Sequence, residues 1–250
     1  MQRLMIAIVV VLTLLTIGRN GAYADSSDLT SVMQRYVSAS GGREALSKIH
    51  NSMTVYKSTI MGRILKVTTT AKTPFYYLQE VQAEGSTGKI SFGFDGTTAW
   101  MRTPDGTVTT LTGEKRAEVI SDAVGANNSE IFPNRWPTTV TLKPTEQIDG
   151  KSYTVLSIKA KDGVTHDLFI DPQTNLPVIE RTIEGNVTGI SVVEAFGKGP
   201  MGELQARIIT STRSDGSPQI KSVLREAQDN APVSASIFAP PIGSKGAQTI

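Results

Sequence analysis

The sequence predicts a mainly β protein with a few helices, built on a curved antiparallel sheet. From about residue 52 onward, apolar and polar residues alternate with a period of two, and Thr, Val, Ile, Tyr and Phe are abundant. Few helical stretches are available to cover one apolar face of so long a sheet, so we expect it to curl on itself, to be capped, or to hold a ligand. Asp-Gly dipeptides, which favour tight antiparallel turns, occur at 95/96, 105/106, 149/150, 162/163 and 215/216.

Helical spacing is confined to two places. Asp28 is a candidate N-cap for a helix over 28–49 that glycines at 41 and 42 interrupt, and a second helix over 114–124 separates two sets of strands. We expect residues 25–250 to form a single domain, although the Pro- and Asn-rich stretch 127–137 could mark a boundary. The expected strands cover 52–61, 63–71, 75–82, 89–95, 98–103, 107–111, 139–147, 152–160, 164–170, 178–184, 188–196, 205–213 and 218–226.

The first 24 residues are typical of a cleavable signal peptide. Arg3 precedes an apolar run over 4–17, and a short polar stretch ends in the A-x-A pattern that predicts cleavage after Ala24. A membrane anchor is the alternative, but this run of about 14 residues is shorter than the roughly 20 that span a membrane. We therefore expect the mature protein to be soluble and periplasmic.

Composition excludes several classes of protein. Removing residues 1–24 takes away two basic residues and no acidic one, which leaves equal numbers of each, and no run of like charge predicts nucleic-acid binding. No later segment is long and apolar enough to predict a membrane span. The chain has no cysteine, so disulfides, thiolate metal sites and an acylated N-terminal cysteine are excluded.

Motif-like strings do not add up to an active site. Gly197, Gly199 and Gly202 fit the dinucleotide-binding pattern, but the residues that follow alternate like a strand and offer no helix for a pyrophosphate. We interpret the two histidines as surface positions, and in a strand His166 and Asp167 would face opposite sides. The sequence therefore predicts no catalytic residue, no metal site and no cofactor.

Aromatic and apolar side chains concentrate on three consecutive expected strands. They could form an ordinary hydrophobic core, or they could line a concave site for an acyl chain, since such sites are mostly apolar and occur in curved β structures. The candidate ligand contacts are Phe75, Tyr77, Ile90, Phe92, Phe94 and Trp100.

Six segments, in this order, carry a resemblance to a known family. They are 36–46 (YVSASGGREAL), 73–75 (TPF), 94–100 (FDGTTAW), 148–153 (IDGKSY), 168–177 (LFIDPQTNLP) and 236–241 (SIFAPP). Together with the broken helix and the mid-chain helix, they resemble the LolA/LolB-like superfamily of outer-membrane lipoprotein-sorting proteins over residues 28–241. The resemblance implies an incomplete β-barrel, with helices plugging or lidding an apolar cavity that receives lipid or lipoprotein acyl chains. No binding residue of the family is carried over.

The sequence thus favours a periplasmic protein that binds a phospholipid or a lipid-modified peptide, as a carrier or sensor, with the helices at 28–49 or 114–124 gating entry. An alternative is a non-catalytic scaffold that binds another envelope protein through a sheet edge or loop. A third hypothesis, a hydrolase, would require a site built on a histidine or a carboxylate.

Overall fold

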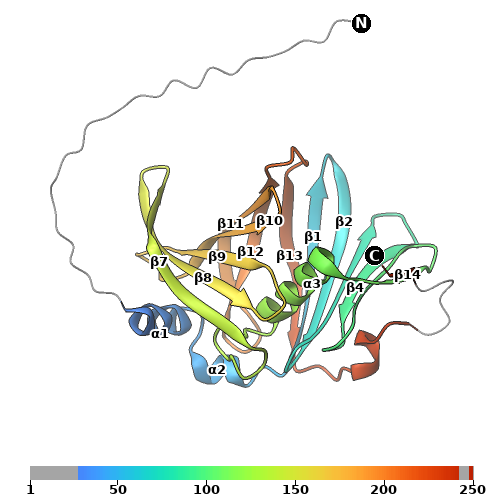
Figure 1. Ribbon diagram of the computed structural model, residues 1–250, viewed down its shortest axis with the longest axis horizontal. Coiled ribbons are helices and arrows are strands. Elements are labelled where there is room, and N and C mark those ends of the chain that lie inside the picture. Colours follow the sequence, from blue (N-terminus) through green and yellow to red (C-terminus); the bar gives the residue numbers. More distant parts are fainter. Residues whose placement is uncertain (1–27, 242–247, 250) are drawn as a thin grey trace, which may run out of the picture.

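The computed structural model describes residues 28–241 and 248–249, and these form one large sheet with the three α-helices on its concave side (Figure 1). The expected signal peptide, residues 1–24, lies outside the described residues. The helices are α1 (Leu29–Ala39), α2 (Arg43–Ser47), α3 (Gly113–Ala126) and the 3-10 helix η1 (Ala235–Phe238). The strands are β1 (Asn51–Ile60), β2 (Arg63–Lys72), β3 (Tyr76–Ala83), β4 (Lys89–Phe94), β5 (Ala99–Arg102), β6 (Val108–Thr110), β7 (Thr138–Ile148), β8 (Lys151–Ala160), β9 (Thr165–Ile170), β10 (Pro177–Glu184), β11 (Val187–Lys198), β12 (Leu204–Arg213), β13 (Ile220–Asp229) and β14 (Gln248–Thr249).

The sheet is open, with β7 at one edge and β14 at the other. Its order in the described residues is β14-β6-β5-β4-β3-β2-β1-β13-β12-β11-β10-β9-β8-β7. The pairings are antiparallel except that of β14 with β6. The mainly β fold and the incomplete barrel are therefore confirmed. All thirteen expected strands are present, with ends that differ from the predicted ones by at most three residues.

Helix α3 crosses the concave face of the sheet and contacts both of its halves (Figure 1). Val119, Ile120, Ala123 and Val124 recur at helical spacing and are all buried. They pack in one cluster with residues of β3, β4 and β5 on one side and with Ala160 of β8 on the other. Because β5 and β8 are far apart in the sheet, packing of α3 against both stabilises the curvature of the sheet.

Helices α1 and α2 pack on the concave side of the sheet near β8 and β9. Asp28 caps α1 by accepting a hydrogen bond from the Ser31 N–H at 2.7 Å, which confirms its predicted role. The apolar side of the helix packs on β8 and β9. Gly41 ends the helix with a φ of 117°, and a Cβ there would lie 2.7 Å from the Cα of Glu203, so only glycine fits this approach to β12.

The Asp-Gly turns differ from one another. Asp149 and Gly150 have φ values of 50° and 77° and form a two-residue hairpin between paired Ile148 and Lys151, as a primed turn requires. At Asp95 the hairpin between β4 and β5 has a four-residue loop rather than a two-residue turn, because the carboxylate accepts hydrogen bonds from the N–H groups of Thr97 and Thr98.

No helix within the described ranges is both long enough and apolar enough to cross a membrane.

An ion-pair network on the convex face links edge strand β7 to β9 and β10. Asp167 of β9 accepts hydrogen bonds from Lys143 at 2.7 Å and from Arg181 at 2.8 Å, and Arg181 also binds Glu146 through two nitrogens. The side chain of Asp167 is only 3% exposed. Burial alone would raise the pKa of Asp167, but these hydrogen bonds outweigh it and hold the pKa below its ordinary value.

Replacing Asp167 by Asn should therefore lower the free energy of unfolding at pH 7 by about 1–3 kcal/mol, because a charge-assisted pair of hydrogen bonds is lost. A carboxylate with a depressed folded pKa stabilises the fold above its unfolded pKa, and this contribution disappears as the pH falls through the folded pKa. Urea unfolding of both proteins should show this difference in the free energy of unfolding at pH 7 and a smaller difference at pH 3. An equal difference in unfolding free energy at pH 7 and pH 3 would contradict an ionic role for Asp167.

Candidate functional site

A cavity of about 840 Å³ lies between the concave face of the sheet and the helices. Its walls combine side chains from distant parts of the chain because the sheet curves around them. Representative apolar residues are Leu65, Val67, Val81, Leu168, Val193, Phe196 and Ile209, and representative polar residues are Ser58, Thr69, Gln79, Ser191, Ser211 and Ser222.

Four serine hydroxyl groups in the cavity are hydrogen-bonded in two pairs. Ser58 and Ser222 are joined at 2.8 Å across β1 and β13, and Ser191 and Ser211 at 2.8 Å across β11 and β12. These pairs satisfy one hydrogen bond each and leave the remaining lone pairs directed at the cavity. The lining of the cavity is therefore amphipathic rather than purely apolar.

Tyr56 bridges a gap in the sheet beside the cavity. Strands β12 and β13 pair only between Ile208–Ser211 and Ile220–Val223, so the carbonyl of Ala206 lacks a partner on β13. The Tyr56 hydroxyl donates to that carbonyl at 2.7 Å from β1. This side chain therefore links β1 to β12 across β13, and both residues line the cavity.

A second lobe of about 380 Å³ lies beside α3 and shares Tyr36, Asp122 and Glu180 with the main cavity. Titratable groups gather in it. Tyr36 donates to Glu130 at 3.2 Å, Tyr77 donates to Asp122 at 3.4 Å, and His166 Nδ1 bonds Glu180. The interpretation of His166 as a surface histidine was wrong, whereas Asp167 does face the opposite side of the sheet, as expected.

The surroundings of these groups shift their pKa values. Burial raises the pKa of Glu130 to about 7 and that of Asp122 to about 7. Burial alone would lower the pKa of His166, but the hydrogen bond and the charge of Glu180 outweigh it, and the pKa lies above its ordinary value. The carboxyl groups of Asp122 and Glu130 therefore change protonation near neutral pH.

A third lobe, of about 370 Å³, extends the cavity between α3 and strands β3 to β5. Phe92, Met101 and Val119 line it, and Gln79 and Asp122 connect it to the main cavity. Among the described residues, no group of three or more His, Asp or Glu side chains is arranged to hold a metal ion.

The six candidate ligand contacts fall into several environments. Phe92 lines the third lobe. Tyr77 and Phe94 are fully buried against α3. Ile90, which is 37% exposed, lies near the start of β4. Phe75 precedes β3 and packs on Trp136, with ring centroids 5.6 Å apart.

Trp100, the sixth, lies on the convex face. It pairs with Gly93 in the neighbouring strand, and a Cβ on that glycine would lie 2.3 Å from the indole ring. Its ring nitrogen donates to the carbonyl of Phe238 at 2.7 Å, and the side chain of Phe238 is buried in the same cluster. These contacts fix the segment around η1 against the sheet.

Sequence reasoning missed most of the main cavity. Its walls come from β1, β2, β11 and β12, whose alternation was recognised but whose inward face was not. The serines on these strands carried the available signal, because polar residues at the positions of an inward face indicate a hydrated cavity rather than a dry core.

Comparison with known proteins supports the fold. A LolA superfamily protein from Nitrosomonas europaea is 13% identical with a TM-score of 0.59, covering 84% of this chain and 96% of that one. A DUF1329 family protein from Desulfovibrio piger is 12% identical with a TM-score of 0.54, covering 84% and 96%. A putative outer membrane lipoprotein-sorting protein domain from Vibrio parahaemolyticus is 8% identical with a TM-score of 0.54, covering 82% and 97%.

No family model and no curated protein matches the sequence. At these low identities, the structural likeness establishes the fold and not the activity. The expected resemblance to LolA-type proteins is confirmed at that level: the chain has the fold of the LolA superfamily.

The half-buried carboxyl group of Glu130 predicts a pH-dependent stability. Its raised folded pKa means that the fold loses stability as the pH rises from the unfolded pKa toward about 7. Glu130→Gln keeps an acceptor for Tyr36 and removes the charge, so it should stabilise the protein by about 2 kcal/mol more at pH 8 than at pH 4.5. Urea unfolding at both pH values measures this. A mutational effect that does not change with pH would show that Glu130 titrates normally.

Proposed function

We propose that this protein binds an amphiphile, a phospholipid or a lipid-modified peptide, in the concave cavity, and acts as a carrier or sensor in envelope lipid or lipoprotein handling. The observation that carries the proposal is the joined cavity, with a main part of about 840 Å³ and two lobes of about 380 and 370 Å³. These volumes lie in the range of small-molecule sites, which span roughly 300–1,000 Å³.

The lining supports a ligand with an apolar chain and a polar end. Each buried methylene contributes roughly 0.8 kcal/mol, and the loss of chain freedom on binding offsets part of this. One acyl chain along Val67, Val193 and Ile209 would therefore be held reversibly. The paired serines and the titratable lobe offer hydrogen bonds to the polar end.

Phe92 extends the proposed site toward β4 and β5, because its side chain lines the third lobe. Ligand contacts by Phe75, Tyr77, Ile90, Phe94 and Trp100 stay predictions. Tyr77 and Phe94 support α3, so a ligand that enlarges the cavity would reach them by displacing that helix.

The proposal includes export through the signal peptide at 1–24, a periplasmic location and no catalytic step. The likeness to the lipoprotein-sorting domain from Vibrio parahaemolyticus supports this choice of ligand class. The alternative is a scaffold that binds another envelope protein, with the cavity left unused.

The direct test is mass spectrometry of an organic extract of the protein purified natively from the periplasm. A lipid present at close to one molecule per chain would support the proposal and identify the class of ligand. If the extract is empty, and stays empty after incubation with liposomes, the scaffold is favoured instead.

A matched pair of variants on β11 tests the location of the site. Val193 faces the cavity, whereas its neighbour Val192 is 39% exposed on the convex face. Val193→Trp fills the cavity and should weaken binding of a fluorescent fatty-acid analogue at least about tenfold, because overfilling a site costs about 1–3 kcal/mol. Val192→Trp should leave binding unchanged. Thermal unfolding verifies that both variants fold, and equal binding by the two would place the ligand elsewhere.

A further inference from the structure

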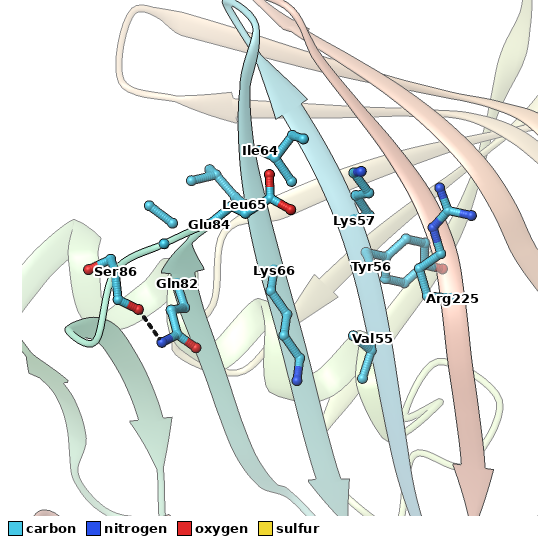
Figure 2. Close-up of a pocket in the computed structure, with 12 residues that line it drawn as sticks. Val55, Tyr56, Lys57, Ile64, Leu65, Lys66, Gln82, Glu84, Ser86 and Arg225 are labelled. Atoms are coloured by element: carbon cyan, nitrogen blue, oxygen red, sulfur yellow. Dashed lines mark hydrogen bonds between the residues drawn. The ribbon is translucent and has the colours of Figure 1, made fainter.

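A separate groove of about 400 Å³ lies on the convex face (Figure 2). It is formed by β1, β2 and β13 together with the loop that follows β3. Tyr56 and Ser58 of β1, and Leu65 and Val67 of β2, line the concave cavity, so the alternating positions 57, 64 and 66 belong to the convex face. Val55 and Ile64 supply apolar surface in the groove.

Three cations surround this groove without a matching set of anions. Figure 2 shows Arg225, Lys57 and Lys66 on three adjacent strands. Lys57 and Lys66 are direct cross-strand partners, an arrangement of like charges that destabilises a sheet. Arg225 lies at the bulge where the register of β13 shifts against β1. The one acidic residue that lines the groove is Glu84.

Two other lysines on the same sheet have carboxylate partners, whereas these three cations do not. Lys221 pairs with Glu194 at 2.7 Å, and Lys89 forms an ion pair with Glu80. In the part of the chain that the structure describes, Lys57, Lys66 and Arg225 have no ion-pair partner. Their charge is therefore available to an anionic partner outside the chain.

The backbone around the groove excludes one common kind of partner. Strands β13, β1, β2 and β3 are all interior strands, paired on both sides. An extended peptide could not add to β1 or β2 as a further strand, since both strands are paired on their two sides around Lys57 and Lys66. The cations also lie across the strands rather than along one edge, which suits a surface of anionic groups.

We propose that this groove docks the protein on an anionic membrane surface, with acidic phospholipid headgroups held between Lys57, Lys66 and Arg225. The groove is on the face opposite the cavity, so docking does not depend on what the cavity binds. Attraction of this kind falls off within a Debye length and is weakened by salt.

The test is co-sedimentation of the purified full chain with vesicles of phosphatidylglycerol and phosphatidylcholine, compared with pure phosphatidylcholine. Lys57→Gln combined with Lys66→Gln should reduce binding to the anionic vesicles about 30-fold, given the usual contribution of a lysine near such a surface. The matched control is Lys161→Gln combined with Lys198→Gln, which removes the same charge from exposed positions outside the groove. It should bind almost as well as the unmodified protein. Glu84→Gln should strengthen binding.

Three results would overturn the proposal: equal binding to both kinds of vesicle, binding that does not weaken in high salt, or equal loss in the two double variants. Binding to polyglutamate without binding to anionic vesicles would also overturn it, in favour of an acidic protein partner. Val193→Trp, which blocks the cavity, should still dock. This arm separates membrane docking from extraction of lipid into the cavity, so failure of one proposal can be told from failure of the other.

Discussion

Helix α3 packs against both ends of the curved sheet at once, and the shape of the cavity depends on this contact. Ile120 and its neighbours bury against β3 to β5, while Ala160 on β8 meets the same cluster from the far side. The Ser121 hydroxyl accepts a hydrogen bond from the N–H of Val164 at 2.8 Å, which fixes the helix to the turn before β9. A single helix cannot cover the whole concave face of so wide a sheet, and the uncovered part is the cavity.

The polar character of that cavity is costly to the fold and useful to a binding site. Glu130 and Asp122 lie where enclosure disfavours their charged forms. An interior selected for stability alone would replace them with apolar groups. Perturbed carboxyl groups in a cavity are typical of functional sites, although structural networks also produce them. Their position beside α3 places the titratable groups next to the helix that holds the cavity's shape.

Much of the fold was readable from the sequence because strand and helix periods are local properties. The expected strands agree with the observed ones, and Asp28 caps α1 as predicted. The site was harder, because a period of two identifies two faces without saying which one lies inside. Phe92 and Trp100 both appeared as aromatic strand residues, yet they lie on opposite faces. His166 has no local signal for burial, since Glu180 reaches it only through the pairing of β9 with β10.

The short ladder between β12 and β13 gives the molecule a spine. On one side of it lie β13, β1 to β6 and β14, and on the other lie β7 to β12, from residues 138–213. Four residue pairs join the two sides there, whereas β1 and β13 share nine. The two sides are therefore joined by a short ladder along one line and by α3, which packs against strands of both sides. The angle between the two sides of the sheet then sets the volume of the cavity. A change in α3 would alter that volume without altering any strand.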